Sequence, residues 1–312
     1  MRGVHLAIGS VLPGLILAAQ AGAQQLVTSG PLVKEGATEK ISAHVYVIPD
    51  FSVPGVPNVG IIVGTRATLV VDTGLGRQNG ETVLHEVRKV SGDRPLYLVT
   101  THVHPEHDLG AQAFPASTKM VRARAQVDEI ASEGMKTADI FRSRSPAMAQ
   151  LLEGAEFRKA DEIFDKERAL DLGGVKARLI AMGPNHTRGD TAIWVEGEGV
   201  LFSGDIAMKA APAFASPASS VKTWLASLDA FDALHPRIIV PSHGPLGDAG
   251  FIRSYREYLT FVRARTAALK SEGRTVDQAL EAVAAEAKAR YPDAGTRLPG
   301  AVRAAYREAS DR

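Results

Sequence analysis

An apolar run that ends in three histidines constrains this chain more than any other stretch of its sequence. "PLYLVTTHVHPEHDLG" places His102, His104 and His107 directly after an almost wholly apolar segment, and Glu106 stands between the last two. Such a run predicts a buried strand, and loops at strand ends are where folds of this kind place their sites. The chain has only nine histidines, so three in one loop indicate a functional site.

The spacing of these residues favours metal binding. In an extended segment, side chains two residues apart point to the same side, so His102 and His104 can offer their imidazoles to one ion. Pro105 then turns the chain, so Glu106 and His107 can face a second ion close by. Imidazole and carboxylate groups suit zinc. Because the chain has no cysteine, any metal site uses nitrogen and oxygen ligands, and stability depends on core burial rather than disulfides.

Three more polar residues follow apolar segments in the same way. "GPNHTRGD" places His186 among turn-forming residues, "GVLFSGD" ends in Asp205, and "RIIVPSHG" places His243 after a predicted strand. Each of them alone is more often structural. Together with the cluster they bring the total to five histidines and two acids, which is enough for two ions.

The order of segments predicts a mixed α/β chain with helices covering sheets. Short β-branched runs and buried strands are expected in "HVYVIP", "VGIIVG", "ATLVVDTG", "PLYLVTTH", "KARLIAMG", "TAIWVEG", "GVLFSGD" and "PRIIVPSHG". Helices are expected in "ETVLHEVRKV", in an insert at about 122–164, in "SVKTWLASLDAFDAL" and in residues 251–312. Residues 24–40 are polar and small, and they predict a loose leader.

Residues 1–23 have the pattern of a secretory signal peptide. Arg2 precedes an apolar run at about 6–19, and small residues lead to a cleavage point after Ala23. The run is shorter than the ~20 residues of a membrane span and is interrupted by proline and glycine, which favours cleavage over anchoring. We therefore expect a periplasmic or secreted protein with no stable membrane span after cleavage.

The charge balance bears on partners. Removing the predicted signal peptide removes one of the 36 basic residues, which leaves 35 basic and 35 acidic residues. A net charge near zero indicates neither nucleic acid nor an anionic membrane as a partner. A small-molecule substrate is expected, and the pattern carries no signal for an oligomeric state.

The motifs "VVDTG", "THVHPEH", "GPNHTRGD", "SGD" and "PSHG" resemble, in this order, those of the metallo-β-lactamase superfamily. The resemblance covers about residues 41–250. It implies an α/β fold, a four-layer αββα sandwich with a metal site at one edge, a helical insert, and C-terminal helices at 251–312 packed on the domain.

The resemblance also implies two zinc ions and a set of ligands. Carried over by position, the ligands would be His102, His104 and His186 for the first ion, Glu106, His107 and His243 for the second, and Asp205 as a bridge between them. Asp72 of "VVDTG" would be the acid that holds the histidine-bearing loop at 101–110, called the metal loop below, in place.

One position departs from the family pattern, which usually has aspartate where this chain has Glu106. Glutamate reaches one methylene further, so it either ligates the second ion or acts in catalysis by orienting the attacking water. Asp108 stands two residues further on and can substitute as a ligand. We expect instead that Asp108 caps a helix that begins near Leu109.

The resemblance implies a zinc-dependent hydrolase. Two ions about 3.5–4 Å apart lower the pKa of a shared water toward ~7, and the resulting metal-bound hydroxide would attack a carboxylic ester, a lactone or a β-lactam-like amide. The alternative is a periplasmic metal-binding accessory protein of a redox system with little hydrolytic turnover. Met135, Phe141 and Met148 of the insert either line an apolar substrate wall or pack the insert onto the body.

Overall fold

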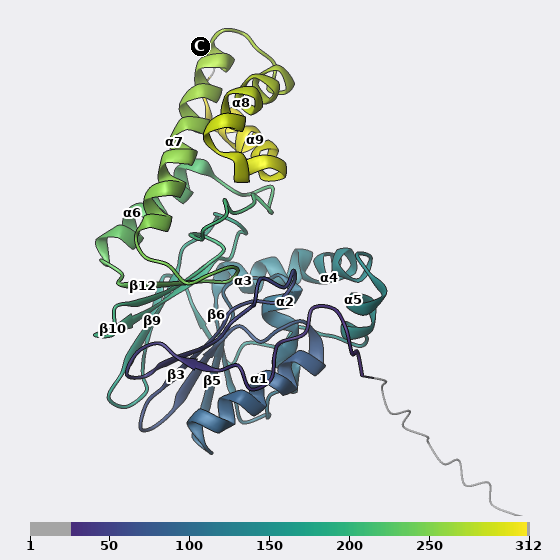
Figure 1. The fold of residues 1–312 in the computed structure, drawn as a ribbon, viewed down its shortest axis with the longest axis vertical. Helices are drawn as coiled ribbons and strands as arrows, with labels where there is room; N and C mark the ends of the chain where they lie inside the picture. The colour runs from purple at the N-terminus through teal and green to yellow at the C-terminus, as the bar shows by residue number, and fades with distance from the viewer. Residues whose placement is uncertain (1–25, 311–312) are drawn as a thin grey trace, which may run out of the picture.

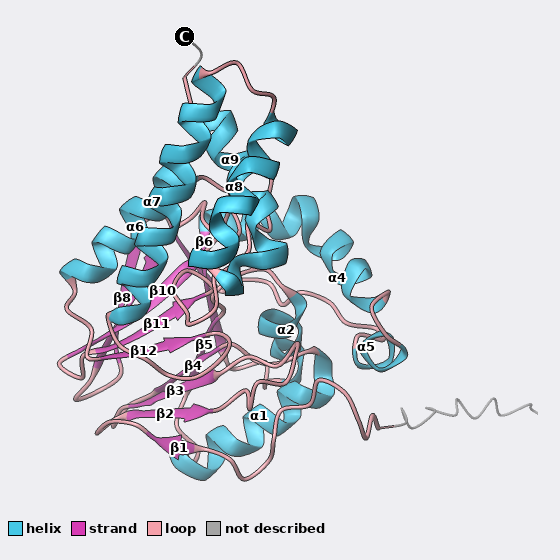
Figure 2. Ribbon diagram, turned by 45° about the horizontal axis from the view of Figure 1, so that its top comes forward, coloured by secondary structure: helices cyan, strands magenta, loops and turns pink. Residues whose placement is uncertain are grey.

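The computed structural model describes residues 26–310. The predicted signal peptide and its cleavage point lie outside the described residues. Two β-sheets face each other, and helices cover the outer face of each sheet, which gives the four layers that the motifs predict (Figures 1 and 2).

The first sheet brings the metal loop to one edge of the sandwich. Its order is β1-β2-β3-β4-β5-β6-β7; pairs from β1 to β4 are antiparallel, and β4 to β7 are parallel. Because parallel strands end at the same edge, Asp72 after β4 and Thr100 after β5 become neighbours. The strands are β1 (Glu39–Lys40), β2 (Val45–Ile48), β3 (Val59–Val63), β4 (Thr68–Val71), β5 (Leu96–Val99), β6 (Lys119–Ala123) and β7 (Glu162–Phe164).

The second sheet brings the remaining candidate ligands to the same edge. Its order is β12-β11-β10-β9-β8, antiparallel except for the parallel pair β11 and β12. Asp205 and His243 follow the ends of this parallel pair, and His186 precedes the start of antiparallel β10. The strands are β8 (Glu167–Asp171), β9 (Lys176–Ala181), β10 (Thr191–Glu196), β11 (Val200–Gly204) and β12 (Ile238–Pro241).

The inner faces of the two sheets form one apolar layer. Val45, Leu69 and Val71 of the first sheet pack with Leu179 and Phe202 of the second. A Cβ at Gly60 would lie 2.2 Å from the Phe202 ring, so only glycine lets the sheets approach this closely at that point. The central strands are apolar on both faces, so one face of each sheet is buried against the other sheet and the opposite face is left for helices to cover.

Helices bury the two outer faces. Val83 and Val87 of α1 pack on the first sheet, and Trp224 and Leu228 of α6 pack on the second together with α7. The C-terminal helices extend this second layer at the far end of the molecule (Figure 1). These helices are α1 (Gly76–Ser91), α6 (Val221–Ala233), α7 (Gly250–Ser271), α8 (Val276–Arg290), the 3₁₀ helix η3 (Pro292–Arg297) and α9 (Leu298–Glu308).

The helical insert is shorter than predicted at both ends. Its first residues belong to strand β6, and its last residues form strand β7. A propensity argument misses these two strands, because pairing of β6 with β5 and of β7 with β6 decides them. The metal loop and the insert contain α2 (Pro105–Asp108), η1 (Leu109–Ala113), α3 (Arg124–Glu129), the π-helix η2 (Ile130–Gly134), α4 (Met135–Arg142) and α5 (Pro146–Leu151).

The leader is docked rather than loose over its described part. The backbone of Val27 exchanges hydrogen bonds of 2.9 and 2.7 Å with the Gln78 side chain, and Val33 donates to Asn79 across 2.7 Å. The polar composition of residues 24–40 hides this docking, because polar side chains of α1 supply the partners. Within residues 26–310, no helix combines the length and the apolar character that crossing a membrane requires.

Candidate metal centre

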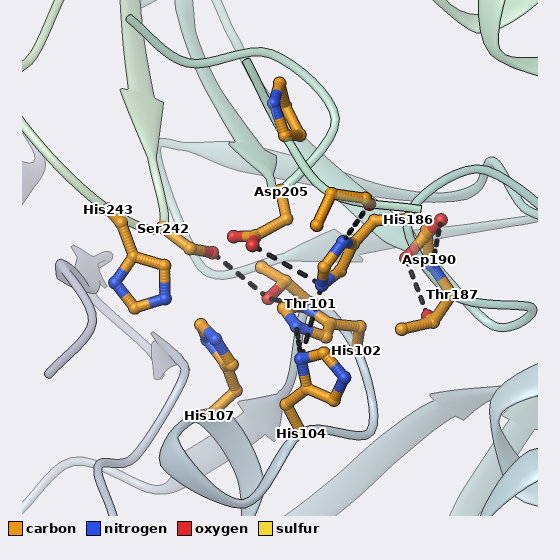
Figure 3. Close-up of polar contacts among 12 residues, drawn as sticks. Thr101, His102, His104, His107, His186, Thr187, Asp190, Asp205, Ser242 and His243 are labelled. Carbon is orange, nitrogen blue, oxygen red and sulfur yellow. Dashed lines mark hydrogen bonds and ion pairs between the residues drawn. The ribbon is translucent and has the colours of Figure 1, made fainter. Parts of the chain in front are cut away.

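All seven candidate ligands meet at the edge where the strands of both sheets end. The metal loop contributes two of its histidines to one group with His186, and Figure 3 shows these three imidazoles turned toward a common point. Nε2 of His102 lies 3.0 Å from Nδ1 of His104, and Nε2 of His186 lies 3.2 Å from the same Nδ1. A tetrahedral zinc ion with Zn–N bonds of about 2.0–2.1 Å places two ligand nitrogens roughly 3.3 Å apart. The three nitrogens therefore have the spacing that one zinc ion needs.

The opposite ring nitrogens of His102 and His186 are held by protein groups, which fixes how these two imidazoles point. Nδ1 of His186 lies 2.6 Å from the carbonyl oxygen of Ala213, and Nδ1 of His102 lies 3.1 Å from the hydroxyl of Thr101. A carbonyl oxygen can only accept, so His186 donates from Nδ1 and keeps the lone pair of Nε2 for a metal.

The second group consists of Glu106, His107 and His243. Their ligand atoms lie within 4.8 Å of one another, and Nε2 of His107 is 3.8 Å from Oε1 of Glu106. His243 donates from Nδ1 to the carbonyl oxygen of Val56 across 2.9 Å, which leaves its Nε2 available. The placement matches the predicted ligand set for a second ion, and zinc binding by these residues stays a prediction.

Asp205 lies between the two groups. Its Oδ2 is 3.4 Å from Nε2 of His186, and it also forms a ligand group with His102 and His107. Figure 3 shows its carboxylate between His243 on one side and His186 on the other. A carboxylate with two oxygens can bind one ion with each, so this position suits a bridge.

Orphaned polar atoms test whether these residues fit a metal. Oε2 of Glu106, Nε2 of His107 and Oδ1 of Asp205 are buried and have no hydrogen-bond partner within the described chain. Leaving a buried polar atom unpaired costs about 1–3 kcal/mol, and three such atoms at one point are a large cost without compensation. The donor set is nitrogen and oxygen only, which zinc accepts, so the residues fit the metal that the motifs imply.

Burial and neighbouring histidines favour the neutral, metal-binding form of His102 and His104, whereas Asp72 favours the charged form of His107. Desolvation, followed by the electrostatic effect of the surrounding histidines, holds the pKa values of His102 and His104 well below 6.5. Burial also acts to lower the pKa of His107, but the charge and hydrogen bond of Asp72 outweigh it and raise this pKa to about 9. A metal ion at Nε2 of His107 would therefore displace a proton.

Asp72 ties the metal loop to strand β4. Its Oδ1 accepts from the backbone N–H of Thr101 across 2.7 Å, and its Oδ2 accepts from Nδ1 of His107 across 2.8 Å. The hydroxyl of Ser242, beside His243, also lies 3.4 Å from Oδ2. One buried carboxylate thus connects loops that carry five of the seven candidate ligands, as the "VVDTG" motif implies.

Asp108 does not cap a helix, contrary to the prediction. Its side chain makes no capping hydrogen bond to η1. It is completely buried and pairs through both oxygens with the guanidinium of Arg122, and it accepts a hydrogen bond of 2.8 Å from Thr100. Arg122 lies on β6, so this partner is visible only once the sheet has formed. Asp108 is in none of the ligand groups found within the described chain.

Asp190 and Glu129 hold the loop that carries His186. Asp190 accepts from the Thr187 hydroxyl across 2.7 Å, and burial raises its pKa to about 6. Glu129 of α3 accepts from the backbone N–H groups of Arg188 and Gly189 at 3.1 and 2.8 Å. Sequence reasoning did not single out either acid, although Asp190 closes the "GPNHTRGD" motif; Glu129 has no local signal.

The segment after β2 holds the loop that carries His243. Oδ2 of Asp50 accepts from the backbone N–H of Gly244 across 2.7 Å. Asn58 donates to the carbonyl oxygens of Pro241 and Gly244 at 2.9 and 2.8 Å. The sequence near Asp50 and Asn58 has no local signal of this role, because their partners lie at or just after the end of β12, far along the chain.

A pocket of about 780 Å³ opens onto the candidate ligands. Helix α4 of the insert forms one wall with Thr137, Ile140 and Phe141, and the Phe141 ring lies 5.7 Å from that of His104. The three apolar residues of the insert therefore differ in whether they line the pocket or pack the insert. Phe141 lines the pocket, Met148 packs among the apolar residues of the insert, and Met135 is 43% exposed.

Comparison with known proteins agrees with this geometry. Residues 52–243 match the family model of the metallo-beta-lactamase superfamily. The linear primary-alkylsulfatase of Pseudomonas sp. is 24% identical over 260 residues, 72% of this chain and 49% of that protein. The human acyl-coenzyme A thioesterase MBLAC2 is 24% identical over 164 residues, 48% of this chain and 57% of that protein. The chain thus spans about half the length of the curated relatives it matches.

Solved structures share the fold. The sec-alkylsulfatase Pisa1 from Pseudomonas sp. superposes with a TM-score of 0.67 at 16% identity, over 87% of this chain and 50% of that chain. A beta-lactamase domain protein from Burkholderia ambifaria superposes with a TM-score of 0.62 at 16% identity, over 87% of this chain and 88% of that one. With its two facing sheets, its ordered motifs and the family model matched over most of the sandwich, the chain belongs to the metallo-beta-lactamase superfamily.

Proposed function

We propose that this protein is a hydrolase that uses two zinc ions to cleave a carboxylic ester, a lactone or a β-lactam-like amide. The observation that carries the proposal is the pair of three-residue ligand groups at one sheet edge, joined by a third group that contains Asp205. This pattern supplies ligands for two neighbouring ions and a carboxylate between them. The relatives support ester-type bonds, since their names describe an alkylsulfatase and an acyl-coenzyme A thioesterase.

The residues of the chain define the roles in this proposal. Zinc ions bound here would supply Lewis acidity and a water activated at neutral pH. Glu106, at the floor of the pocket beside the second ligand group, holds either that ion or the attacking water through its unpaired Oε2. Asp72 keeps His107 in the orientation that binds metal. Phe141 and Ile140 line the pocket on the side of the insert.

We also propose that the protein acts in the periplasm or outside the cell. The support is the order of charge, apolar run and small residues within 1–23. N-terminal sequencing of the protein from a bacterial periplasmic fraction tests this, with a new N-terminus near residue 24 as the expected result.

The decisive experiment combines metal analysis with a substrate panel. The purified protein is assayed for zinc content and for turnover of an aryl ester, a lactone and a chromogenic cephalosporin, before and after treatment with a chelator. We expect about two zinc ions per chain, hydrolysis of at least one substrate, and loss of that activity on chelation. A protein that keeps its metal but turns over none of the three would favour the redox accessory role instead.

A further inference from the structure

Two arginines line the metal pocket, and each comes from a segment outside the two sheets. Arg144 follows α4 of the insert, and Arg297 ends the 3₁₀ helix η3 of the C-terminal region. These segments lie far apart in the sequence, yet both guanidinium-bearing residues border the same cavity as His104 and Asp205. Neither arginine belongs to the family motifs.

Arg144 reaches the pocket across Phe141. Its guanidinium carbon lies 3.6 Å from the centre of the Phe141 ring, and that ring in turn lies beside the imidazole of His104. Stacking on an aromatic ring holds a guanidinium in place while its N–H groups stay available. Arg144 is exposed at the pocket and makes no ion pair with a carboxylate of residues 26–310, so its guanidinium is open to a ligand.

Arg297 is held from behind. Its Nη1 donates to the carbonyl oxygen of Ala211 across 2.5 Å, which anchors one arm of the fork and leaves the other donors free of any partner identified in residues 26–310. The side chain is half-buried, and it too lacks an ion pair there. Anchoring reduces the entropy lost when such a fork binds an oxyanion.

The acidic residues of the pocket do not neutralise these arginines. Asp50 accepts hydrogen bonds from the N–H groups of Gly244 and Ser52. Glu106 and Asp205 are candidate metal ligands and lie beside the histidines of their groups. Two cations beside a centre that would bind further cations repel one another, and an anion that enters the pocket relieves this repulsion. A guanidinium fork matches the paired oxygens of a carboxylate, sulfate or phosphate group.

We infer that Arg144 and Arg297 recognise an acidic group that the substrate carries away from its scissile bond. The substrate class would then be an ester with a second, anionic end, bound with the ester at the metal ligands and the anion at the arginines. This inference rests on the proposed hydrolase function, and it names the substrate class for which the same pocket would be specific.

The test uses two esters that differ by one charge. The nitrophenyl monoester of glutaric acid and the nitrophenyl ester of valeric acid share the leaving group and acyl length, but only the first has a terminal carboxylate. Each is assayed with the full-length zinc-loaded protein and with Arg144→Gln, Arg297→Gln and the corresponding lysine variants. Arg124→Gln is the matched control, because Arg124 is an exposed arginine of the insert with only a surface partner.

We expect each glutamine variant to raise KM for the glutarate monoester roughly ten- to a hundredfold, the size of a lost charge-assisted hydrogen bond. The kcat value and the valerate kinetics should stay within about twofold, lysine should restore part of the affinity, and zinc content should not change. Calorimetric titration with glutarate should show the same loss of affinity without any turnover.

Three results would overturn the inference. Equal losses for both esters would mean that the arginines only shape the pocket. Unchanged KM and glutarate affinity in the variants would mean that they contact no anion. A fall in kcat for both esters with unchanged KM would place them at the scissile group instead. Failure of the hydrolase proposal is distinguishable, because neither ester would turn over while the calorimetric difference would remain.

Discussion

Nδ1 of His107 donates a hydrogen bond to Oδ2 of Asp72 across 2.8 Å, and both side chains are almost completely buried. The bond directs Nε2 of His107 toward Glu106 and His243 and joins the metal loop to the end of strand β4. A carboxylate behind a metal-binding imidazole fixes the ring and increases its basicity. The proposed second ion site would therefore depend on a residue outside its own ligand group.

Replacing this carboxylate tests that dependence. Asp72→Asn keeps the shape of the side chain but removes its charge, so we expect the affinity of the second ion to fall about ten- to a hundredfold. Titration with a competing chelator measures the affinity of each ion. Asp190→Asn serves as a comparison, because Asp190 supports the loop of His186 and should weaken the first ion instead. Unchanged affinity for both ions in Asp72→Asn would contradict the prediction.

Removal of one imidazole tests the first ion site. His186→Ala removes one of three nitrogens that face a common point, so the first ion and turnover should both be lost. The melting temperature in the presence of zinc should also fall, because metal binding contributes to folding. His85→Ala removes an exposed histidine on α1 and should change none of these quantities. Normal zinc content and activity in His186→Ala would exclude it as a ligand.

Two variants of Glu106 distinguish its two possible roles, metal ligand or water-positioning group. If it binds the second ion, Glu106→Gln should weaken that ion, while Glu106→Asp should retain it with altered affinity. If it positions the water, both variants should hold two zinc ions and turn over more slowly, by the 10²–10⁴-fold typical of such groups. Zinc content and kcat are measured for both variants. Wild-type values in both would show that Glu106 has neither role.

The buried pair of Asp108 and Arg122 predicts a non-additive effect on stability. Arg122→Met leaves a completely buried carboxylate without its partner, which should lower the free energy of unfolding by about 3–5 kcal/mol. The double variant Arg122→Met with Asp108→Leu removes both charges and should recover much of the loss. Urea unfolding of the two single variants and the double variant measures the coupling. Additive losses would argue against a direct interaction.

Glu86 predicts a loss of stability in acid that does not involve the metal. Burial alone would raise its pKa, but hydrogen bonds from Lys89, Thr38 and the N–H of Gly36 outweigh this and lower it to about 2. The charged carboxylate of Glu86 therefore stabilises the fold, and this contribution is fully present above its ordinary pKa of 4.5. This contribution is lost as the pH falls from 4.5 toward 2.

Urea unfolding at pH 6 and pH 3 measures this dependence. The difference in stability between wild type and Glu86→Gln should be large at pH 6 and smaller at pH 3. A difference that does not change with pH would show that the carboxylate charge is not the cause.

The sequence by itself determined strands β2 to β5 and β9 to β12, the superfamily fold and the candidate ligands. Each of these has a local signal. Alternating or continuous apolar runs specify strands because one or both faces must be buried. The candidate ligands follow strand ends, in motifs that occur in the order typical of the superfamily. The departure at Glu106 was also visible from the sequence, because it occupies a fixed place within "HVHPEH".

Only the tertiary structure decided which groups hold those ligands in position. The partner of Asp108 is on strand β6, and Glu129 reaches the loop of His186 from the insert. Arg144 and Arg297 line one pocket although about half of the chain separates them. An acidic residue or an arginine reads the same in a sequence whether its side chain faces water or a buried partner. Its role depends on long-range contacts, and these exist only after burial has brought the two sheets, the insert and the C-terminal helices together.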